Sequence, residues 1–407
     1  MMLLVNVILY LIRYYTMGVS YVKVNTLLNA LVFMYIVLKP FYLWSSGLPQ
    51  IADFILAFVV LMAIFYVKLP KNKIVEHNKF ILVALLFVFY VTLVNFVWFI
   101  ILGDEYSLIF NVLFYVFNIL SMIAIILLHN SGLFKGLLVV VYKGIVASVL
   151  LQCVLYLFLG NDDPGRATNF FNNPNQLAYY ALFCLSFLLI IERKIKYRTV
   201  IFIMAVLACF FLIFITLSLG AIAGALFLFV VHVFISRKKG LYKFISLSLS
   251  VFAVVFLYIL TTNIDFLYYR HELLDRLLWR FERGNVSGES FIIERAYDRI
   301  LNHPEYWILG AGEGAYDRFN SVANYEIHST LGTVFFSYGA IGLLLFAAML
   351  FYIFYKNKII YAYPIVAIMI YGLTHNGLRN SMLWLMFALL IIASVKVNDK
   401  TPKEKVS

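Results

Sequence analysis

Charge is what this sequence has least of: Asp, Glu, Lys and Arg make up 13% of its 407 residues. A soluble domain carries about 25% charged residues, so an ordinary solvated surface is excluded for most of the chain. Cysteine is also rare, and all three residues fall inside apolar runs: Cys153, Cys184 and Cys209. Their spacing excludes a disulfide framework and a cysteine metal site, and it predicts three small packing residues.

Apolar sequence is abundant instead, at 64% of the chain, and runs long enough to cross a bilayer recur along its length. Lipid offers the backbone no hydrogen-bond partners, so such segments must be helical. We therefore predict an all-α polytopic membrane protein with about twelve transmembrane helices. Their predicted ranges are 24–44, 51–67, 80–102, 107–128, 137–159, 176–191, 199–216, 219–236, 244–261, 329–355, 359–374 and 382–395.

The predicted organisation has four parts. Nine transmembrane helices occupy residues 1–261, a long polar loop occupies 262–328, three further helices occupy 329–395, and a tail occupies 396–407. The apolar segment 1–12 is short, and it is expected either to lie at the interface or to extend the first span. No signal-peptide cleavage pattern follows it.

Positive charge alternates between the connections of these spans. Lys and Arg are concentrated in 68–79, 193–198, 237–243, 356–358 and the tail from Lys396, whereas the alternate short loops hold Arg166, Arg379 and little else. This asymmetry predicts that the basic group and both termini are cytoplasmic. It also accounts for most of the net charge of +12. Because the basic residues are spread over separate loops, nucleic-acid binding is not expected.

The loop 262–328 is predicted to lie outside the cytoplasm and contains arginine but no lysine. Arginine presents a planar fork that binds phosphate or carboxylate in two places. Ordinary pairing with the acidic residues of the same loop is an equally good explanation on charge alone. The seven arginines are Arg270, Arg276, Arg280, Arg283, Arg295, Arg299 and Arg318.

Two amphipathic helices are predicted within this loop, over 270–283 and 292–301, with Pro304 ending the second. Arg295 and Arg299 would then lie one turn apart on the second helix. Both helices are expected to lie flat on the membrane or to pack as a lid on the bundle. The glycine-rich run "GAGEGAY" at 310–316 is expected to permit a tight turn or close backbone approach to a ligand, not to bind a dinucleotide.

Three polar segments border the predicted spans. "RATNFFNNPNQ" at 166–176 places an arginine and several amides between two apolar segments. "EIHST" at 326–330 places His328 where the long loop re-enters the membrane, near Glu326, so its imidazole is expected to titrate close to neutral pH. An isolated histidine is more often structural than catalytic, but this position raises its interest. "THNGLRN" at 374–380 adds His375 and Arg379 at a depth where polar residues tend to be functional.

These segments resemble a known family. "RATNFFNNPNQLA" resembles the Arg-x-Thr-Gly-x-Phe-x-Asn-Pro-Asn-x-Leu-Ala signature of the O-antigen ligase and polymerase superfamily. "NHPEYWILGAGEGAYDRF" and "EIHSTLGTVFFSYGAIGLLLF" resemble its later segments, in family order, over residues 160–395. "LKPFYLWSSGLPQIAD" at 38–53 looks closer to the Wzy-type polymerase branch. The resemblance implies a GT-C-like membrane fold in the bacterial inner membrane.

The sequence departs from the family pattern at three places. Asn169 stands where the signature has glycine, Leu219 stands where many members have arginine, and Glu289 follows Ser-Gly where many ligases have arginine. Two arginines that the wider family often uses are therefore missing. Arg295, Arg299 or Arg379 is expected to take over their part.

The resemblance implies inverting glycosyl transfer from an undecaprenyl-diphosphate-linked glycan, without a cofactor or metal. Arg166 and either Arg295 or Arg299 would hold the diphosphate, and His328, tuned by Glu326, would accept the acceptor proton. The remaining expected substrate contacts are Asn172, Asn175, Arg318, His375 and Arg379. The adjacent pair Asp162 and Asp163 is interpreted as a solubilising pair and not a cation site. Membrane lipid and a chain-length regulator are the other expected partners.

Three alternatives remain at this stage. An O-antigen ligase would use the same residues with a different acceptor, the lipid A core. A lipid-linked-glycan flippase or other secondary transporter would fit twelve spans, although no internal repeat is visible in the sequence. In the third alternative, the polar loop would serve only as a docking surface for a partner.

Overall fold

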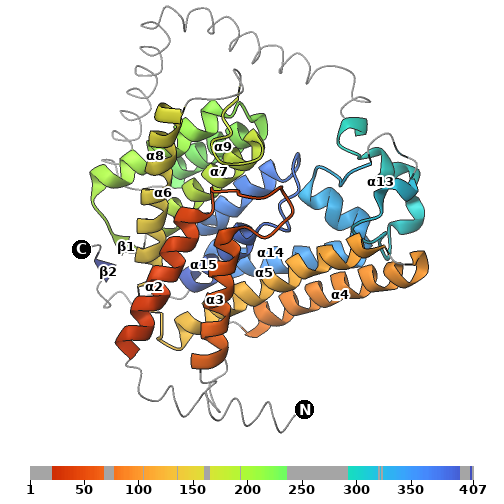
Figure 1. Cartoon of the computed structure of the whole chain (residues 1–407), viewed down its shortest axis with the longest axis horizontal. Helices are drawn as coiled ribbons and strands as arrows, with labels where there is room; N and C mark the ends of the chain where they lie inside the picture. Colours follow the sequence, from red (N-terminus) through yellow and green to blue (C-terminus); the bar gives the residue numbers. More distant parts are fainter. Residues whose placement is uncertain are drawn as a thin grey trace, which may run out of the picture.

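The computed structural model describes residues 21–67, 78–103, 105–134, 136–159, 166–192, 194–235, 292–319, 321, 324–394 and 404–405 (Figure 1). Several predicted features lie outside these residues. They are the segment 1–12, the span 244–261, the loop helix 270–283, Glu289, the pair Asp162 and Asp163, the basic connection 237–243, and most of the connection 68–79 and of the tail. The described α-helices are α2 (Tyr21–Leu38), α3 (Ile51–Tyr66), α4 (Asn78–Leu102), α5 (Tyr106–Asn130), α6 (Leu137–Leu159), α7 (Pro174–Ile191), α8 (Thr199–Ile215), α9 (Leu219–Ile235), α13 (Asp298–Asn302), α14 (Thr330–Tyr371) and α15 (Ser381–Ser394). Short 3₁₀ helices are η1 (Pro304–Tyr306) and η2 (Tyr316–Phe319), and two-residue strands are β1 (Ile195–Lys196) and β2 (Glu404–Lys405).

Five described helical segments are long and apolar enough to cross a membrane: α4, α5, Leu137–Phe158 of α6, α7 and Thr330–Asn357 of α14. Six shorter apolar helical segments accompany them. This agrees with the prediction of a helical, multi-pass membrane protein. The first predicted span is too long, because α2 ends at Leu38 and not at residue 44. Pro40 explains the early end, since the residue before a proline is disfavoured in helical conformation.

Helix α14 reverses direction along its length. Its 42 residues would measure about 63 Å if straight. Yet the backbone N–H of Thr330 at its start donates to the carbonyl of Gly372, just past its end, at 2.6 Å. The helix therefore has two arms, Thr330–Asn357 and Ala362–Tyr371, that fold back on each other. They correspond to the predicted spans 329–355 and 359–374, although the second arm is shorter than expected.

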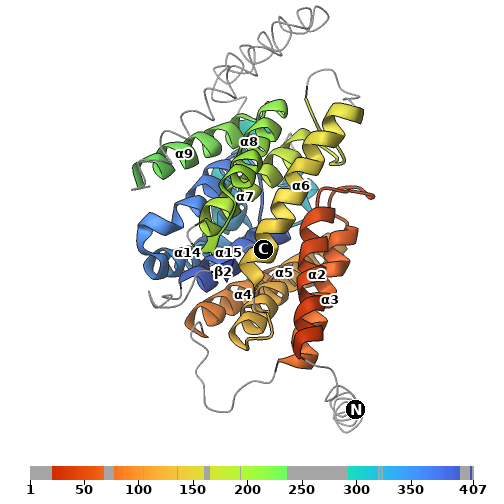
Figure 2. The same cartoon turned by 90° about the vertical axis from the view of Figure 1, so that its left-hand side faces the viewer.

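Helices α7 and α15 form the centre of the bundle, and nearly all of their residues are buried. Helix α15 packs against α5, α7 and α14, while α2 packs against α3 and α6 on the outside (Figures 1 and 2). Outer helices such as α4 expose large apolar side chains, as expected for helices that face lipid. The central helices therefore fix the positions of the polar connections at their ends.

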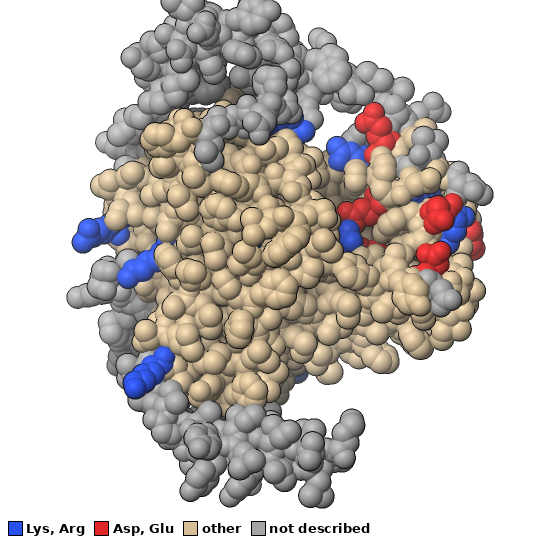
Figure 3. Space-filling model, viewed as in Figure 1, with Lys and Arg blue, Asp and Glu red and all other residues tan. Residues whose placement is uncertain are grey.

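Those connections gather at two ends of the bundle. At one end β1 pairs with β2, so the predicted cytoplasmic connection 193–198 lies beside the tail. At the other end Tyr42 N–H donates to Phe170 O at 3.1 Å and Ala167 N–H donates to Ile215 O at 3.0 Å. On the face seen in Figure 3, Lys and Arg stand without acidic neighbours near the first end, and the two signs mix around α13. Most of the predicted basic connections lie outside the described residues, so the charge alternation and the compartment of each end stay predictions.

The second predicted amphipathic helix of the long loop is wrong in extent. Ala296 has a left-handed backbone with φ of +56°, which interrupts the helical pattern, and α13 covers only Asp298–Asn302. Arg295 therefore precedes the helix and Arg299 lies within it, so the two guanidinium groups diverge. Pro304 starts η1 directly afterwards.

The glycine-rich run packs tightly against α14. A Cβ atom on Gly310 would stand 2.4 Å from the carbonyl oxygen of Ser337, and Ala311 N–H donates to Phe336 O at 2.9 Å. Gly339 of α14 is equally close to this segment, since a Cβ atom on it would stand 2.2 Å from Ile308 O. The close backbone approach expected toward a ligand is therefore made toward a helix.

Candidate active site

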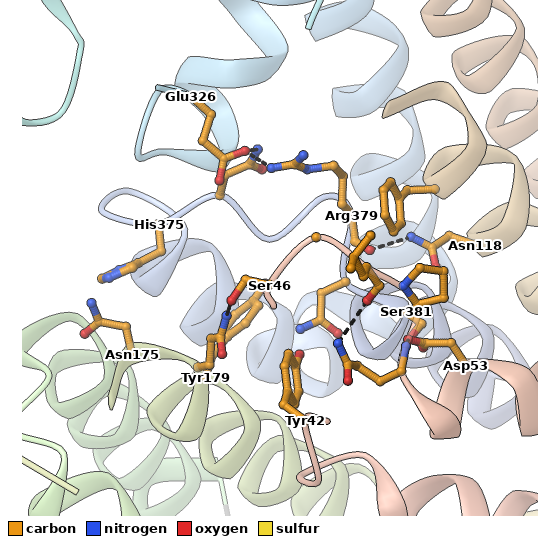
Figure 4. Close-up of a pocket in the computed structure, with 18 of the residues that line it drawn as sticks. Tyr42, Ser46, Asp53, Asn118, Asn175, Tyr179, Glu326, His375, Arg379 and Ser381 are labelled. Atoms are coloured by element: carbon orange, nitrogen blue, oxygen red, sulfur yellow. Dashed lines mark hydrogen bonds and ion pairs between the residues drawn. The ribbon is translucent and has the colours of Figure 1, made fainter. Parts of the chain in front are cut away.

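A cavity of about 750 Å³ opens among the connections at the end of the bundle where α7 begins (Figure 4). Its walls come from the α2–α3 connection, α3, α5, the start of α7, the segment 294–328 and the turn between α14 and α15. Six of the ten residues predicted for the site line this cavity: Asn175, Arg295, Glu326, His328, His375 and Arg379.

The start of α7 brings its amides to the cavity. Asn173 caps the helix by accepting a hydrogen bond from Gln176 N–H at 3.0 Å, and Pro174 occupies the first turn. Both features favour a helix start at this point, because the cap satisfies an orphan N–H and proline needs none. Asn175 is thereby held at the cavity wall.

Arg166 stands one layer behind that wall. Its guanidinium donates to the side-chain oxygen of Asn175 at 2.8 Å and to the carbonyl of Thr216 at 2.8 Å. Asn172 likewise lies outside the lining and donates to Ser46 Oγ at 3.1 Å, which ties the α2–α3 connection to the start of α7. Both residues support the cavity rather than line it.

His328 is held against an aromatic ring. Its imidazole stacks on Tyr325 with ring centroids 4.7 Å apart, and its backbone N–H donates to Arg295 O at 3.1 Å. Burial, and then the positive charge of Arg295, lower the pKa of His328 below the ordinary value of 6.5. The neutral imidazole, which is able to accept a proton, is therefore favoured.

Glu326 is engaged by Arg379 and not by His328 among the described contacts. The guanidinium of Arg379 donates to the Glu326 carboxylate and to Asn111 Oδ1, the latter at 2.7 Å. Its Nε stands 3.4 Å from a carboxylate oxygen of the buried Glu313. Arg379 thus lies between two carboxylates, so its charge is largely matched inside the protein. This corrects the expectation that Glu326 tunes the histidine.

Arg295 and His375 are both held at the turn that follows α14, where cationic and aromatic groups combine. Arg295 donates from its guanidinium to the carbonyl of Thr374, and the His375 ring stacks on Tyr371 with centroids 4.4 Å apart. The hydroxyl of Thr374 lies 3.0 Å from His375 Nδ1. These contacts fix both predicted residues to the turn that follows α14.

Arg299 and Arg318 do not line the cavity. Arg299 is fully buried and donates to Ser321 Oγ at 2.8 Å and to Tyr325 O at 2.7 Å. Arg318 donates to Ala311 O and stands over the Trp98 ring. Their expected contacts with substrate do not match these positions, because the break before α13 turns Arg299 inward. Both guanidinium groups hold the folded end of the long loop together.

Glu313 is a buried carboxylate that the sequence reading missed. Its Oε2 accepts hydrogen bonds from the hydroxyls of Tyr115 at 2.6 Å and Tyr338 at 2.8 Å. Its backbone N–H donates to Asn95 Oδ1 at 2.8 Å, and its Oε1 faces Arg379. A signal was present, since Glu313 is a lone carboxylate inside a run of small residues between apolar segments.

A buried pair at the far end of the cavity was also missed. The ammonium of Lys39 donates to Asp53 Oδ1 at 2.7 Å, and Ser381 Oγ donates to the same oxygen at 3.2 Å. Lys39 follows α2 and Asp53 lies in the first turn of α3. The available signal was a lysine inside the last turns of the predicted span 24–44 and an aspartate in the first turn of the predicted span 51–67.

The charges along the cavity are balanced. Three basic residues face three acidic ones: Lys39, Arg295 and Arg379 against Asp53, Glu294 and Glu326. Four of these six residues form two ion pairs, Lys39 with Asp53 and Arg379 with Glu326. Arg295 and Glu294 are adjacent in the chain and add one charge of each sign to the same lining.

Comparison of the sequence with protein-family models and with curated proteins found no match. Function is therefore inferred from the geometry of the cavity and from the motifs that resemble the O-antigen ligase and polymerase superfamily.

Proposed function

We propose that this protein is an inverting glycosyltransferase that joins oligosaccharide repeat units carried on a polyprenyl diphosphate, as an O-antigen or related polysaccharide polymerase does. The reaction would take place at the periplasmic face of the inner membrane. One observation carries the proposal: Arg295 and His328 both line the same cavity, and a hydrogen bond of 3.1 Å joins their backbones.

Arg295 suits the leaving group. When the bond between the anomeric carbon and the diphosphate oxygen breaks, negative charge grows on the diphosphate. A guanidinium held in place beforehand stabilises that charge without reorganising, which is worth about 3 kcal/mol in comparable sites. Asn175, oriented by Arg166 at 2.8 Å, adds an amide at the start of α7.

His328 suits the acceptor. The acceptor hydroxyl loses its proton as its oxygen attacks the anomeric carbon from the face opposite the leaving diphosphate, which inverts the configuration. A neutral imidazole is able to take that proton. Because burial and Arg295 lower the pKa of His328, the imidazole stays neutral at the pH where the reaction would run.

The apolar wall of the cavity suits a lipid carrier. Helices α3 and α5 contribute Phe54, Phe110 and Leu113, whose side chains are exposed at the surface of the bundle. A cavity with one lipid-facing wall and one polar end matches a substrate with a hydrocarbon tail and a charged head. This feature favours a lipid-linked donor over a nucleotide sugar.

The test uses purified protein and lipid-linked repeat units, with chain length read by gel. Arg295→Gln and His328→Ala are each expected to lower the rate at least about a hundredfold. Arg198→Gln, an exposed residue at the other end of the bundle, and His303→Ala, outside the cavity lining, are the matched controls. If both cavity variants fold and lengthen chains at the wild-type rate, the assignment fails.

The product distinguishes the polymerase from its alternatives. Loss of the gene leaves single repeats on the final acceptor if the protein is a polymerase. It leaves free lipid-linked polymer if the protein is a ligase. Movement of lipid-linked glycan across vesicles without any glycosyl transfer would assign a transporter instead.

A further inference from the structure

We propose that the Lys39–Asp53 pair, together with Ser381, forms the subsite that binds the terminal sugar of the acceptor, and that this sugar is a neutral, hydroxyl-rich ring. The inference rests on the proposed function. It gives a role to the end of the cavity that holds Lys39 and Asp53, which take no part in the proposed reaction.

Hydrogen bonds among buried side chains hold this end of the cavity in place. The side chain of Lys39 is 7% exposed and that of Asp53 is 16% exposed, so both charges are nearly withdrawn from solvent. Asp53 accepts three hydrogen bonds, from Lys39 Nζ at 2.7 Å, Gln50 N–H at 3.0 Å and Ser381 Oγ at 3.2 Å. Ser381 Oγ also lies 2.9 Å from the hydroxyl of Tyr35. Removing two charges from water costs free energy that their attraction does not always recover, so a buried ion pair favours a role beyond stability.

The connection that covers this end is organised by one side chain. The oxygen of the Gln50 amide accepts from Leu43 N–H at 2.9 Å and Trp44 N–H at 3.2 Å, and its nitrogen donates to Leu48 O at 3.1 Å. The α2–α3 connection is therefore ordered before any ligand arrives. Such preorganisation lowers the entropy cost of binding.

The chemistry of the pair favours a neutral ligand. An ammonium donates and a carboxylate accepts, so together they satisfy hydroxyl groups, each of which both donates and accepts. The pair carries no net charge, so it gives a phosphate no advantage. Tyr42 and Phe117 add flat apolar faces to the same lining, which suits the C–H face of a sugar ring.

The subsite is connected to Arg379, which lines the same cavity. Arg379, which binds Glu326, and Ser381, which binds Asp53, are two residues apart and so at most about 7 Å apart along the chain. Figure 4 shows Asp53 and Ser381 on one side of the cavity and His375 on the other, with Tyr179 between them. An acceptor whose terminal sugar is seated at Asp53 would therefore extend across the cavity toward the side that carries His375.

The experiment measures binding separately from transfer. The probe is the lipid-free repeat-unit oligosaccharide released by mild acid from the host cell's own lipid-linked precursor, added to the full-length protein in nanodiscs. Its dissociation constant is measured by calorimetry for the wild type, Lys39→Met, Asp53→Asn and the double variant Lys39→Met/Asp53→Asn. The double variant leaves no unpaired buried charge, so it keeps the test valid if a single variant fails to fold. Glu305→Gln, an exposed residue outside the cavity lining, is the control.

The expected result is a dissociation constant at least about tenfold higher in the folded variants, with the control unchanged, and a raised KM for acceptor with an unchanged KM for donor. If every folded variant binds the oligosaccharide as tightly as the wild type does, the subsite is overturned, even if transfer is confirmed. No wild-type binding would overturn it as well. Binding that depends on Lys39 and Asp53 in a protein that transfers no sugar would support the subsite and sink the proposed function.

Discussion

Arg166 donates a hydrogen bond to the side-chain oxygen of Asn175 at 2.8 Å, and only Asn175 of the two reaches the cavity lining. The arginine of the most distinctive sequence motif therefore acts on the cavity through an amide. Its second bond, to Thr216 O at 2.8 Å, anchors the guanidinium to the connection after α8. Arg166 is a positioning residue in this geometry, and a fork with two directed bonds is what a lysine cannot supply.

Arg166→Lys and Asn175→Ala are accordingly expected to share one effect. Each single variant should lower the transfer rate by about tenfold to a hundredfold through misorientation of the cavity wall. The double variant should be no slower than the slower single one, because both remove the same arrangement. The three rates, measured on lipid-linked repeat units at saturating donor, give the coupling directly. Fully additive losses would show that Arg166 contacts substrate independently.

The pH dependence of transfer follows from the environment of His328. Burial first, and the charge of Arg295 second, lower its pKa below 6.5. A base works in its neutral form, so the wild-type rate should stay level as pH falls past 6.5 and decline only at lower pH. Arg295→Gln removes the electrostatic contribution and should move the acidic limb toward higher pH, in addition to lowering the rate. A wild-type limb at or above the ordinary histidine pKa, or a limb that stays in place in Arg295→Gln, would contradict this.

Hydropathy predicted the bounds of several described helices well, because a helix surrounded by lipid or apolar helices must be apolar on most sides. Helix α6 covers Leu137–Leu159, as predicted, and α9 covers Leu219–Ile235 against a predicted 219–236. The predicted helix bounds are wrong where the conformation of a single residue decides whether a helix continues. Ala296 adopts φ of +56°, which nothing in an alanine encodes, and this separates Arg295 from Arg299.

The site was partly predictable for a related reason. Motif residues such as His328 and Asn175 stand at the ends of predicted spans, so charge alternation alone places them on one face. The pairs Lys39–Asp53 and Arg379–Glu326 depend on which helices are neighbours, and hydropathy carries no such information. Glu313 was overlooked because its partners, Tyr115 and Tyr338, come from α5 and α14.

The buried network around Glu313 should be important for stability. Tyr115→Phe removes a hydroxyl that donates to the carboxylate at 2.6 Å, and it is expected to cost about 2 kcal/mol. Glu313→Leu should cost about 3 kcal/mol, because it leaves two buried hydroxyls and Arg379 without this carboxylate. The matched control is Tyr142→Phe, whose buried hydroxyl has no hydrogen-bond partner among the described residues. Unfolding midpoints in detergent rank the variants, and an equal midpoint for Tyr115→Phe and Tyr142→Phe would argue against the network.

Two glycines with nearly the same backbone conformation separate strain from crowding. Gly310 has φ of +92° and Gly47 has φ of +91°, so alanine is conformationally unfavourable at both, by about 1–2 kcal/mol. A Cβ at Gly47 would meet nothing within 4 Å, whereas one at Gly310 would stand 2.4 Å from Ser337 O and 2.5 Å from Tyr338 Cα. Those neighbours are backbone atoms of α14, which have no rotamer to yield. Gly310→Ala should therefore lower the unfolding midpoint far more than Gly47→Ala, by an added cost of about 2 kcal/mol or more. Equal midpoints for the two variants would mean that the glycine-rich run does not press against α14, and the positions of Glu313 and Arg379, which depend on that contact, would lose their support.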